Sequence, residues 1–188
     1  MDAGDFYSGS LIHSLAVQSH IPYFPEYEFF SGLDYDAITL GNHEFDAGDI
    51  GLDIMLAKVG KLGAKVPIVS SNLKRDHRYI KKSRLIKLKN ENGEYLSIGI
   101  LGALGPDGCS VSRGNRLSNQ FVGFDDSRAS QEWSLLYEEL RSQALSLKKT
   151  GADIVVLLLH GGGAVSYTHL RAHETDSYLV CRLLLEKR

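Results

Sequence analysis

The sequence predicts an α/β fold in which an open sheet is covered by helices. Three short apolar runs, residues 35–40, 66–69 and 153–159, have the length and composition of buried strands. Residues 50–62 and 130–149 instead place apolar side chains at helical spacing, and each segment is followed by a glycine that can end a helix. This strand–loop–helix–strand order is typical of a sheet with helices packed on it.

Two further helices are expected before the first of these strands. Residues 8–18 place four apolar side chains on one helical face, with a serine near the start as a candidate N-cap. Residues 25–30 form the second predicted helix, which stops at Gly32. The run at residues 35–40 then leads directly into a polar loop at residues 41–48.

The middle of the chain predicts a β-hairpin. Residues 79–89 and 94–101 are extended runs on either side of a turn that contains Asn92 and Gly93. Asn-Gly favours a tight hairpin turn, because both residues tolerate positive φ. The residues that follow, 102–123, are rich in glycine and serine and lack periodicity, which predicts a loop.

Composition restricts the classes of function. Hydrophobic residues make up 43% of the chain, enough for a core, and the two cysteines, Cys109 and Cys181, cannot form a disulfide framework. The net charge of −2, without a basic block, argues against a nucleic-acid polymer as partner. No apolar run approaches the ~18 residues of a membrane-spanning helix, so no membrane span is expected.

Polar side chains cluster in three glycine-flanked loops. Asp5 follows Gly4, while Asn42, His43 and Asp46 lie in the loop after the first predicted strand, and His160 ends the last one. Loops at the carboxyl ends of strands gather at one edge of an open sheet, where ligands bind. Asp, Asn and His side chains suit Zn, Mn, Fe or similar divalent ions. Taken singly each signal is weak, because a lone Gly-Asp is usually a turn and a lone histidine is usually a hydrogen-bonded surface residue.

Taken in order, these motifs resemble the calcineurin-like metallophosphoesterases. The extended form Asn-His-Glu-Phe-Asp is similar to the 5′-nucleotidase/UDP-sugar hydrolase branch of that family. The motifs that carry the resemblance are Gly4-Asp5 followed by Gly9, Gly32-Leu33-Asp34-Tyr35-Asp36-Ala37, Gly41-Asn42-His43-Glu44-Phe45-Asp46, Ser71-Asn72-Leu73, Ile98-Gly99-Ile100-Leu101-Gly102 and the late His160.

The resemblance implies a role for each site residue and two divalent metal ions (Zn, Mn, Mg, Fe or similar) as cofactors. Asp5 would bridge both metals, and Asn42 and His160 would ligate the second. His43 would not be a ligand; it would donate to the phosphate or leaving group, held by Asp46. A carboxylate hydrogen-bonded to an imidazole favours the charged imidazole, which suits that role.

The function implied is two-metal hydrolysis of phosphate esters or anhydrides of nucleotides, the reaction of a 5′-nucleotidase type of hydrolase. The substrate would be a nucleotide or another phosphate ester, and the sequence does not identify its binding residues. A cyclic-nucleotide phosphodiesterase and a sulfur-compound hydrolase of the same branch are alternatives. The resemblance also implies an exported location, which would be periplasmic, secreted or at the cell surface.

The family pattern contains two motifs that this chain lacks. An Asp-x-His segment would precede Asp5, and a Gly-His-x-His segment would follow His160; neither occurs in the sequence. We therefore expect residues 1–164 to be a partial metallophosphoesterase domain truncated at both ends, folded as an incomplete α/β/β/α sandwich. The alternative function for the chain by itself is an inactive fragment with at most weak metal binding.

The last segment, residues 165–188, has two interpretations. His169 and His173 lie four apart and precede Glu174, a spacing of helical zinc ligands. However, residues 165–175 resemble the translation of a transposase sequencing adapter, and residues 179–187 resemble the flow-cell primer that follows it. We therefore expect residues 165–188 to be a non-native, artefactual tail that packs nowhere useful.

Overall fold

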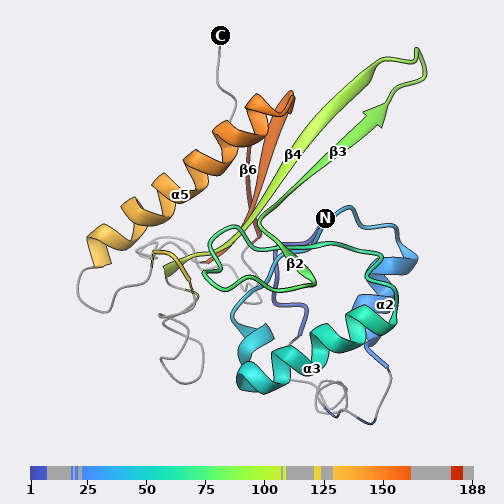
Figure 1. The fold of residues 1–188 in the computed structure, drawn as a ribbon, viewed down its shortest axis with the longest axis vertical. Coiled ribbons are helices and arrows are strands. Elements are labelled where there is room, and N and C mark those ends of the chain that lie inside the picture. Colours follow the sequence, from blue (N-terminus) through green and yellow to red (C-terminus); the bar gives the residue numbers. More distant parts are fainter. Residues whose placement is uncertain are drawn as a thin grey trace, which may run out of the picture.

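The computed structural model describes residues 1–7, 18, 20, 23–106, 108, 121–123, 129–161 and 179–183 of the chain. The helix predicted over residues 8–18 and most of the loop predicted over residues 102–123 lie outside these described residues, as do His169, His173 and Glu174. Figure 1 shows helices on two sides of a region of strands, with the hairpin extending away from the rest.

The first layer consists of two helices, α2 (Pro25–Gly32) and α3 (Gly48–Lys61), in agreement with the predicted helices. The apolar face of α3 is buried against the core. Helix α2 contributes Tyr27 and Phe30 to the same core. Gly63, with φ of 85°, follows α3 in the left-handed conformation that glycine adopts readily. The core residues that α3 supplies are Leu52, Met55, Leu56 and Val59.

The second layer is a small parallel sheet of β1 (Ile68–Val69) and β2 (Ile80–Lys81). Ile38 pairs with Ile68 on the other side of β1, and Asp2 pairs in turn with Ile38, both in parallel. The strand expected over residues 35–40 is therefore reduced to single bridges at Ile38, and the one expected over residues 66–69 is reduced to two residues. Pro67, which has no N–H to donate, immediately precedes β1.

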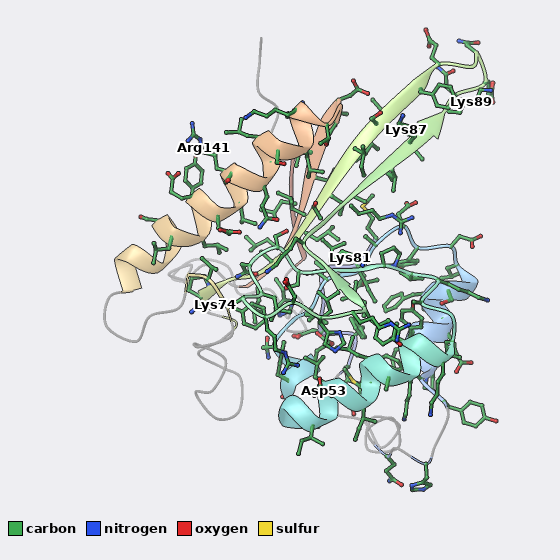
Figure 2. All side chains as sticks on the ribbon, viewed as in Figure 1. Asp53, Lys74, Lys81, Lys87, Lys89 and Arg141 are labelled. Carbon is green, nitrogen blue, oxygen red and sulfur yellow. The ribbon has the colours of Figure 1, made fainter. Side chains whose placement is uncertain are left out.

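The third layer is a four-stranded sheet in the order β3-β4-β5-β6. The predicted hairpin is formed by β3 (Ser83–Lys89) and β4 (Tyr95–Leu104), paired antiparallel. Gly93, with φ of 86°, lies in its turn, and the Asn90 side chain accepts a hydrogen bond from the Glu94 N–H at 2.8 Å. The far half of this hairpin is exposed and includes Lys87 and Lys89 (Figure 2).

The rest of this sheet consists of β5 (Ile154–His160), which runs parallel to β4, and β6 (Leu179–Leu183), which pairs antiparallel with β5. The expectation that residues 165–188 pack nowhere useful is therefore wrong for β6. Main-chain groups make the ladder hydrogen bonds, so an open strand edge can accept an extended segment of almost any sequence.

The fourth layer is helix α5 (Ala129–Lys149), which lies on one face of the β3–β6 sheet (Figure 1). Its Leu147 packs with Leu101 of β4 and Val155 of β5. The opposite face of the sheet meets the small sheet in a separate cluster formed by Ala3, Ala37, Val69, Ile86, Ile100 and Leu158. The order helix, sheet, sheet, helix is the α/β/β/α sandwich that the resemblance implied. In the part of the chain that the structure describes, no helix is both long enough and apolar enough to cross a bilayer.

The two sheets are joined by buried polar groups at the end of β1. Asn72 is completely buried, and its side chain both donates to the Leu104 carbonyl (2.8 Å) and accepts from the Leu104 N–H (3.2 Å). It thus pairs with β4 as a strand residue would. Nearby, a Cβ at Gly102 would overlap the Val69 carbonyl oxygen and the Thr39 side chain, so the sheets approach too closely here for any side chain.

Gly102→Ala is therefore expected to destabilise the fold. Overpacking of this kind costs about 1–3 kcal/mol, because backbone and side chains of both sheets must shift. For a chain of this size that corresponds to a fall in Tm of roughly 2–10 °C, measurable by thermal denaturation followed by circular dichroism.

The matched control is Gly32→Ala at the end of α2, where no atom lies within 4 Å of the added Cβ. Its Tm should stay within about 2 °C of the parent value. Equal Tm values for the Gly102→Ala and Gly32→Ala variants would show that the sheets can separate at this point without loss.

Candidate functional site

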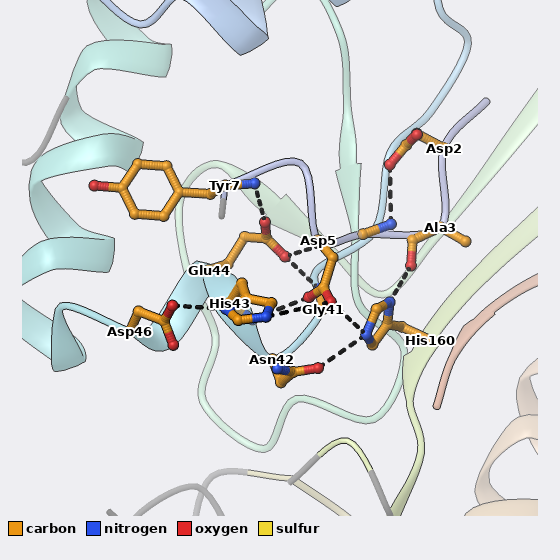
Figure 3. A network of polar contacts seen from close by, with 11 residues as sticks. Asp2, Ala3, Asp5, Tyr7, Gly41, Asn42, His43, Glu44, Asp46 and His160 are labelled. Carbon is orange, nitrogen blue, oxygen red and sulfur yellow. Dashed lines mark hydrogen bonds and ion pairs between the residues drawn. The ribbon is translucent and has the colours of Figure 1, made fainter. Parts of the chain in front are cut away.

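Three loops meet at one end of the sheets and bring together all five residues predicted from the sequence. Asp5 lies just beyond the bridge at Asp2, Asn42 and His43 lie just beyond the Ile38 bridge, and His160 is the last residue of β5 (Figure 3). His160 is also in register with Leu104, the last residue of β4. The strand ends therefore gather these side chains at one edge, as the α/β rule predicts.

Asp5, Asn42 and His160 converge on one point. The His160 Nε2 atom lies 3.0 Å from the Asn42 Oδ1 atom and 3.2 Å from the Asp5 Oδ2 atom. The other ring nitrogen, Nδ1, lies 3.0 Å from the Ala3 carbonyl oxygen. Because a carbonyl oxygen can only accept, Nδ1 carries a proton and orients the ring.

This arrangement requires a positive species between the three side chains. With its proton on Nδ1, neutral His160 would turn the Nε2 lone pair toward two oxygen acceptors, which is repulsive. Burial works against a charged His160, but the Asp5 carboxylate outweighs it and raises the His160 pKa above its ordinary value. Either a second proton on His160 or a bound metal ion satisfies the cluster.

The distances from His160 Nε2 to the other two side-chain atoms fit a divalent metal. Ligand atoms about 2.1–2.2 Å from a metal, at right angles to one another, are roughly 3.0 Å apart. The two separations at His160 Nε2 are close to this value. Among the described residues no group of three or more His, Cys, Asp or Glu side chains has metal-binding spacing, and this trio differs in having an asparagine as one member.

Asp5 has a backbone conformation that is rare for a residue with a side chain. Its φ is 60°, in the left-handed region, which aspartate tolerates better than most residues. Its Oδ1 atom accepts a hydrogen bond from the His43 N–H at 3.0 Å. Burial favours the neutral acid, yet the hydrogen bonds from His160 and from the His43 N–H hold the pKa of Asp5 below its ordinary value.

His43 and Asp46 form a pair beside this trio. The short 3-10 helix η1 (His43–Phe45) places residues three apart on the same face, and the His43 Nδ1 atom lies 2.6 Å from the Asp46 Oδ2 atom. The His43 Nε2 atom is 4.0 Å from Asp5 Oδ2, and the His43 side chain is 41% exposed, so a ligand at the site can reach it. Burial opposes the charged ring, but the Asp46 hydrogen bond and the negative charges of Asp5, Asp46 and Glu44 together outweigh it and raise the pKa of His43.

Glycine is required at two positions in these loops. Gly4 has φ of 98°, and a Cβ there would overlap the Gly41 backbone. A Cβ at Gly41 would in turn overlap Asp5 and lie 2.9 Å from the His160 ring. The two loops thus touch through their backbones, which brings Asp5 and Asn42 side by side.

Glu44 makes more contacts within the site than the sequence analysis predicted. The sequence predicts Glu44 and Phe45 as structural residues beneath the loop, and Phe45 does pack in the core, edge-on to Phe121. Glu44, however, is completely buried and accepts hydrogen bonds from the backbones of both loops. Burial raises its pKa to about 7, although these N–H donors favour the charged form. Its position in the Gly41–Asp46 motif, next to Phe45, gave no local sign that its side chain would be buried.

Comparison with known proteins indicates the family to which the chain is similar. No protein-family model matches the chain. Over 166 residues, 86% of this chain, it is 32% identical to an apyrase of Anopheles gambiae and covers 25% of that protein. Over 162 residues, 82% of this chain, it is 30% identical to a 2′,3′-cyclic-nucleotide 2′-phosphodiesterase/3′-nucleotidase of Salmonella typhimurium and covers 23% of it.

A solved structure is also similar to this chain. The calcineurin-like phosphoesterase YfkN from Bacillus subtilis matches with a TM-score of 0.62 and 27% identity, over 86% of this chain and 47% of that one. The chain spans about a quarter of the length of the curated relatives it matches.

Metal binding at the Asp5–Asn42–His160 trio should release a proton. Because the His160 pKa is raised, part of the population carries the extra proton near neutral pH, and a metal must displace it. Affinity should therefore fall as the pH is lowered through that pKa, by roughly tenfold per pH unit below it. Isothermal titration of Mn²⁺ in buffers of different ionisation enthalpy measures the proton count.

His77→Gln is the control, because His77 lies 3.8 Å from Asp53 and outside the trio. This variant should release the same number of protons as the parent. Mn²⁺ affinity that is independent of pH between about pH 6 and 8 would contradict the raised His160 pKa and its place at the metal.

Proposed function

Because the chain belongs to the calcineurin-like phosphoesterases, in the group that includes 5′-nucleotidases and apyrases, we propose that it forms part of an active site that hydrolyses phosphate esters or anhydrides of nucleotides with two divalent metals. The observation that carries this proposal is the convergence of Asp5 Oδ2, Asn42 Oδ1 and His160 Nε2 on one point. The relatives supply the reaction class, and the site supplies the residues.

In this proposal Asp5 would be a ligand for both metals, and Asn42 and His160 would help to hold the second one. The His160 Nδ1–H bond to the Ala3 carbonyl supports it, since metal-bound imidazoles are commonly oriented by a hydrogen bond at the other nitrogen. When bound, the metals would supply an activated water molecule and stabilise charge on the phosphoryl oxygens.

The His43–Asp46 pair would act on the substrate without holding metal. The Asp46 carboxylate orients the His43 ring and favours its charged form, which leaves the Nε2–H available as a donor. That atom would donate to a phosphate oxygen or to the leaving group as negative charge develops there. The 4.0 Å separation from Asp5 Oδ2 is consistent with a group next to the metal position and not bound to it.

The activity proposed here is that of a longer polypeptide. The chain contains neither an Asp-x-His nor a Gly-His-x-His segment, and three candidate ligands are too few to hold two metals tightly. For the 188-residue chain by itself we propose weak metal binding and little or no turnover. By resemblance, the enzyme would be exported.

A second candidate substrate is a 2′,3′-cyclic nucleotide. The observation that favours it is the 30% identity to the Salmonella typhimurium 2′,3′-cyclic-nucleotide 2′-phosphodiesterase/3′-nucleotidase. Comparison of kcat/KM for 5′-nucleotides and 2′,3′-cyclic nucleotides in the full-length protein distinguishes the two candidates.

Two substitutions in the full-length protein separate metal binding from substrate activation. Asn42→Ala should lower both metal content and turnover, because it removes a ligand. His43→Ala should lower kcat by roughly 10²–10⁴-fold while metal content stays unchanged, because it removes only the donor to the substrate. Phosphate release from a 5′-nucleotide and elemental analysis of the purified variants give the two readouts.

Asn92→Ala and His20→Ala serve as controls, because both side chains are exposed and distant in sequence from the site loops. Neither should change turnover or metal content by more than about twofold. Loss of bound metal in His43→Ala would make His43 a ligand and overturn its proposed role.

A further inference from the structure

The Glu44 carboxylate links the two site loops from below. Its Oε1 atom accepts the Tyr7 N–H at 2.9 Å, and its Oε2 atom accepts the N–H groups of Asp5, at 2.9 Å, and of Gly41. Two of these donors belong to one loop and the third to the other, 34 or more residues apart in the chain. A side chain with no exposed surface therefore has all its hydrogen bonds with the backbone of the site.

The groups that Glu44 holds are the ones that fix the metal trio. Asp5 has a left-handed φ of 60°, and its N–H is one of the three donors. The Asp5 carboxylate is tied back to the second loop by the His43 N–H. These two hydrogen bonds and the covalent link between His43 and Glu44 close a ring that sets the position of the Asp5 carboxylate relative to Asn42.

Only a carboxylate of this length meets the requirement. An ionised carboxylate has two acceptor oxygens and no donor, so it can take three N–H groups. A glutamine has one acceptor oxygen, and its NH₂ group would face an N–H group of the backbone, leaving buried donors unsatisfied. An aspartate keeps both acceptors but is one methylene shorter, so it would draw the two loops out of position.

We propose that Glu44 is a positioning residue that sets the geometry of the Asp5–Asn42–His160 trio and thereby its metal affinity, without touching the metal or the substrate. This proposal rests on the metal-binding part of the proposed function, and it does not depend on turnover. It assigns to the Glu of Gly41-Asn42-His43-Glu44 a role distinct from those of its neighbours, since Asn42 and His43 face the site while Glu44 faces the loop backbones (Figure 3).

The test uses the 188-residue chain with Mn²⁺ alone as probe, at about pH 8. Glu44→Gln should weaken Mn²⁺ binding by roughly tenfold or more, as measured by electron paramagnetic resonance. Glu44→Asp should fall between Glu44→Gln and the parent, because it keeps the charge and both acceptors. In NMR spectra, the amide signals of Asp5, Tyr7 and Gly41 should move upfield and exchange faster in both variants.

A core truncation separates positioning from general destabilisation. Val59→Ala removes buried side-chain volume from α3 and is expected to lower Tm while leaving Mn²⁺ affinity within about twofold of the parent. If Glu44→Gln does not fold, the comparison of Glu44→Asp with Val59→Ala at equal Tm loss decides the question.

Two results would overturn the proposal, and they have different consequences for the proposed metal site. Parent-like Mn²⁺ affinity in a folded Glu44 variant would remove the positioning role and leave the metal site intact. No Mn²⁺ binding by the parent chain, even at millimolar metal, would overturn the positioning role in this chain, whereas the proposed function is decided separately by the metal content and turnover of the full-length protein.

Discussion

The backbone contact between Gly4 and Gly41 is the constraint on which the candidate site depends. Asp2 pairs with Ile38, so two segments far apart in the sequence leave the small sheet side by side. The absence of side chains at both glycines then allows the loops to touch. The next residue in each loop, Asp5 or Asn42, is a metal-ligand candidate. The short side chains of Asp5 and Asn42 can reach a common point because the backbones of the two loops are already in contact.

Three carboxylates lie within these two loops, and each is stabilised by different hydrogen-bond partners. Glu44 is held by backbone N–H groups, Asp46 by the His43 ring, and Asp5 by His160 together with the His43 N–H. Of these three, Asp5 is the one whose carboxylate faces the other candidate metal ligands, His160 and Asn42. The local excess of negative charge favours a cation at the position where Asp5 and His160 meet.

The sequence predicted the parts of this structure that depend on local patterns. Helices α3 and α5 follow from apolar spacing, and the β3–β4 hairpin follows from Asn-Gly between two extended runs. The meeting of Asn42 and His160 followed from the strand-end rule, because each follows a predicted strand, whereas the place of Asp5 beside them followed from the family resemblance. The reduction of residues 35–40 to a bridge at Ile38 depends on neighbours in other segments and could not be read from the run itself.

Contacts with other segments of the chain also explain the remaining differences between the sequence prediction and the structure. The partners of Glu44 lie 3 to 39 residues away, and a charged residue in a loop carries no local sign of being buried. The pairing of β6 with β5 depends on an open strand edge, which the sequence of residues 179–183 does not indicate.

The left-handed φ of Asp5 has a consequence for any mutational scan of this protein. Position 5 is restricted twice, by the chemistry of its carboxylate and by a backbone that only Gly, Asn and Asp adopt readily. An alanine there removes the candidate ligand and adds strain at once, whereas asparagine changes the chemistry alone, so only the second substitution reports on what the carboxylate contributes.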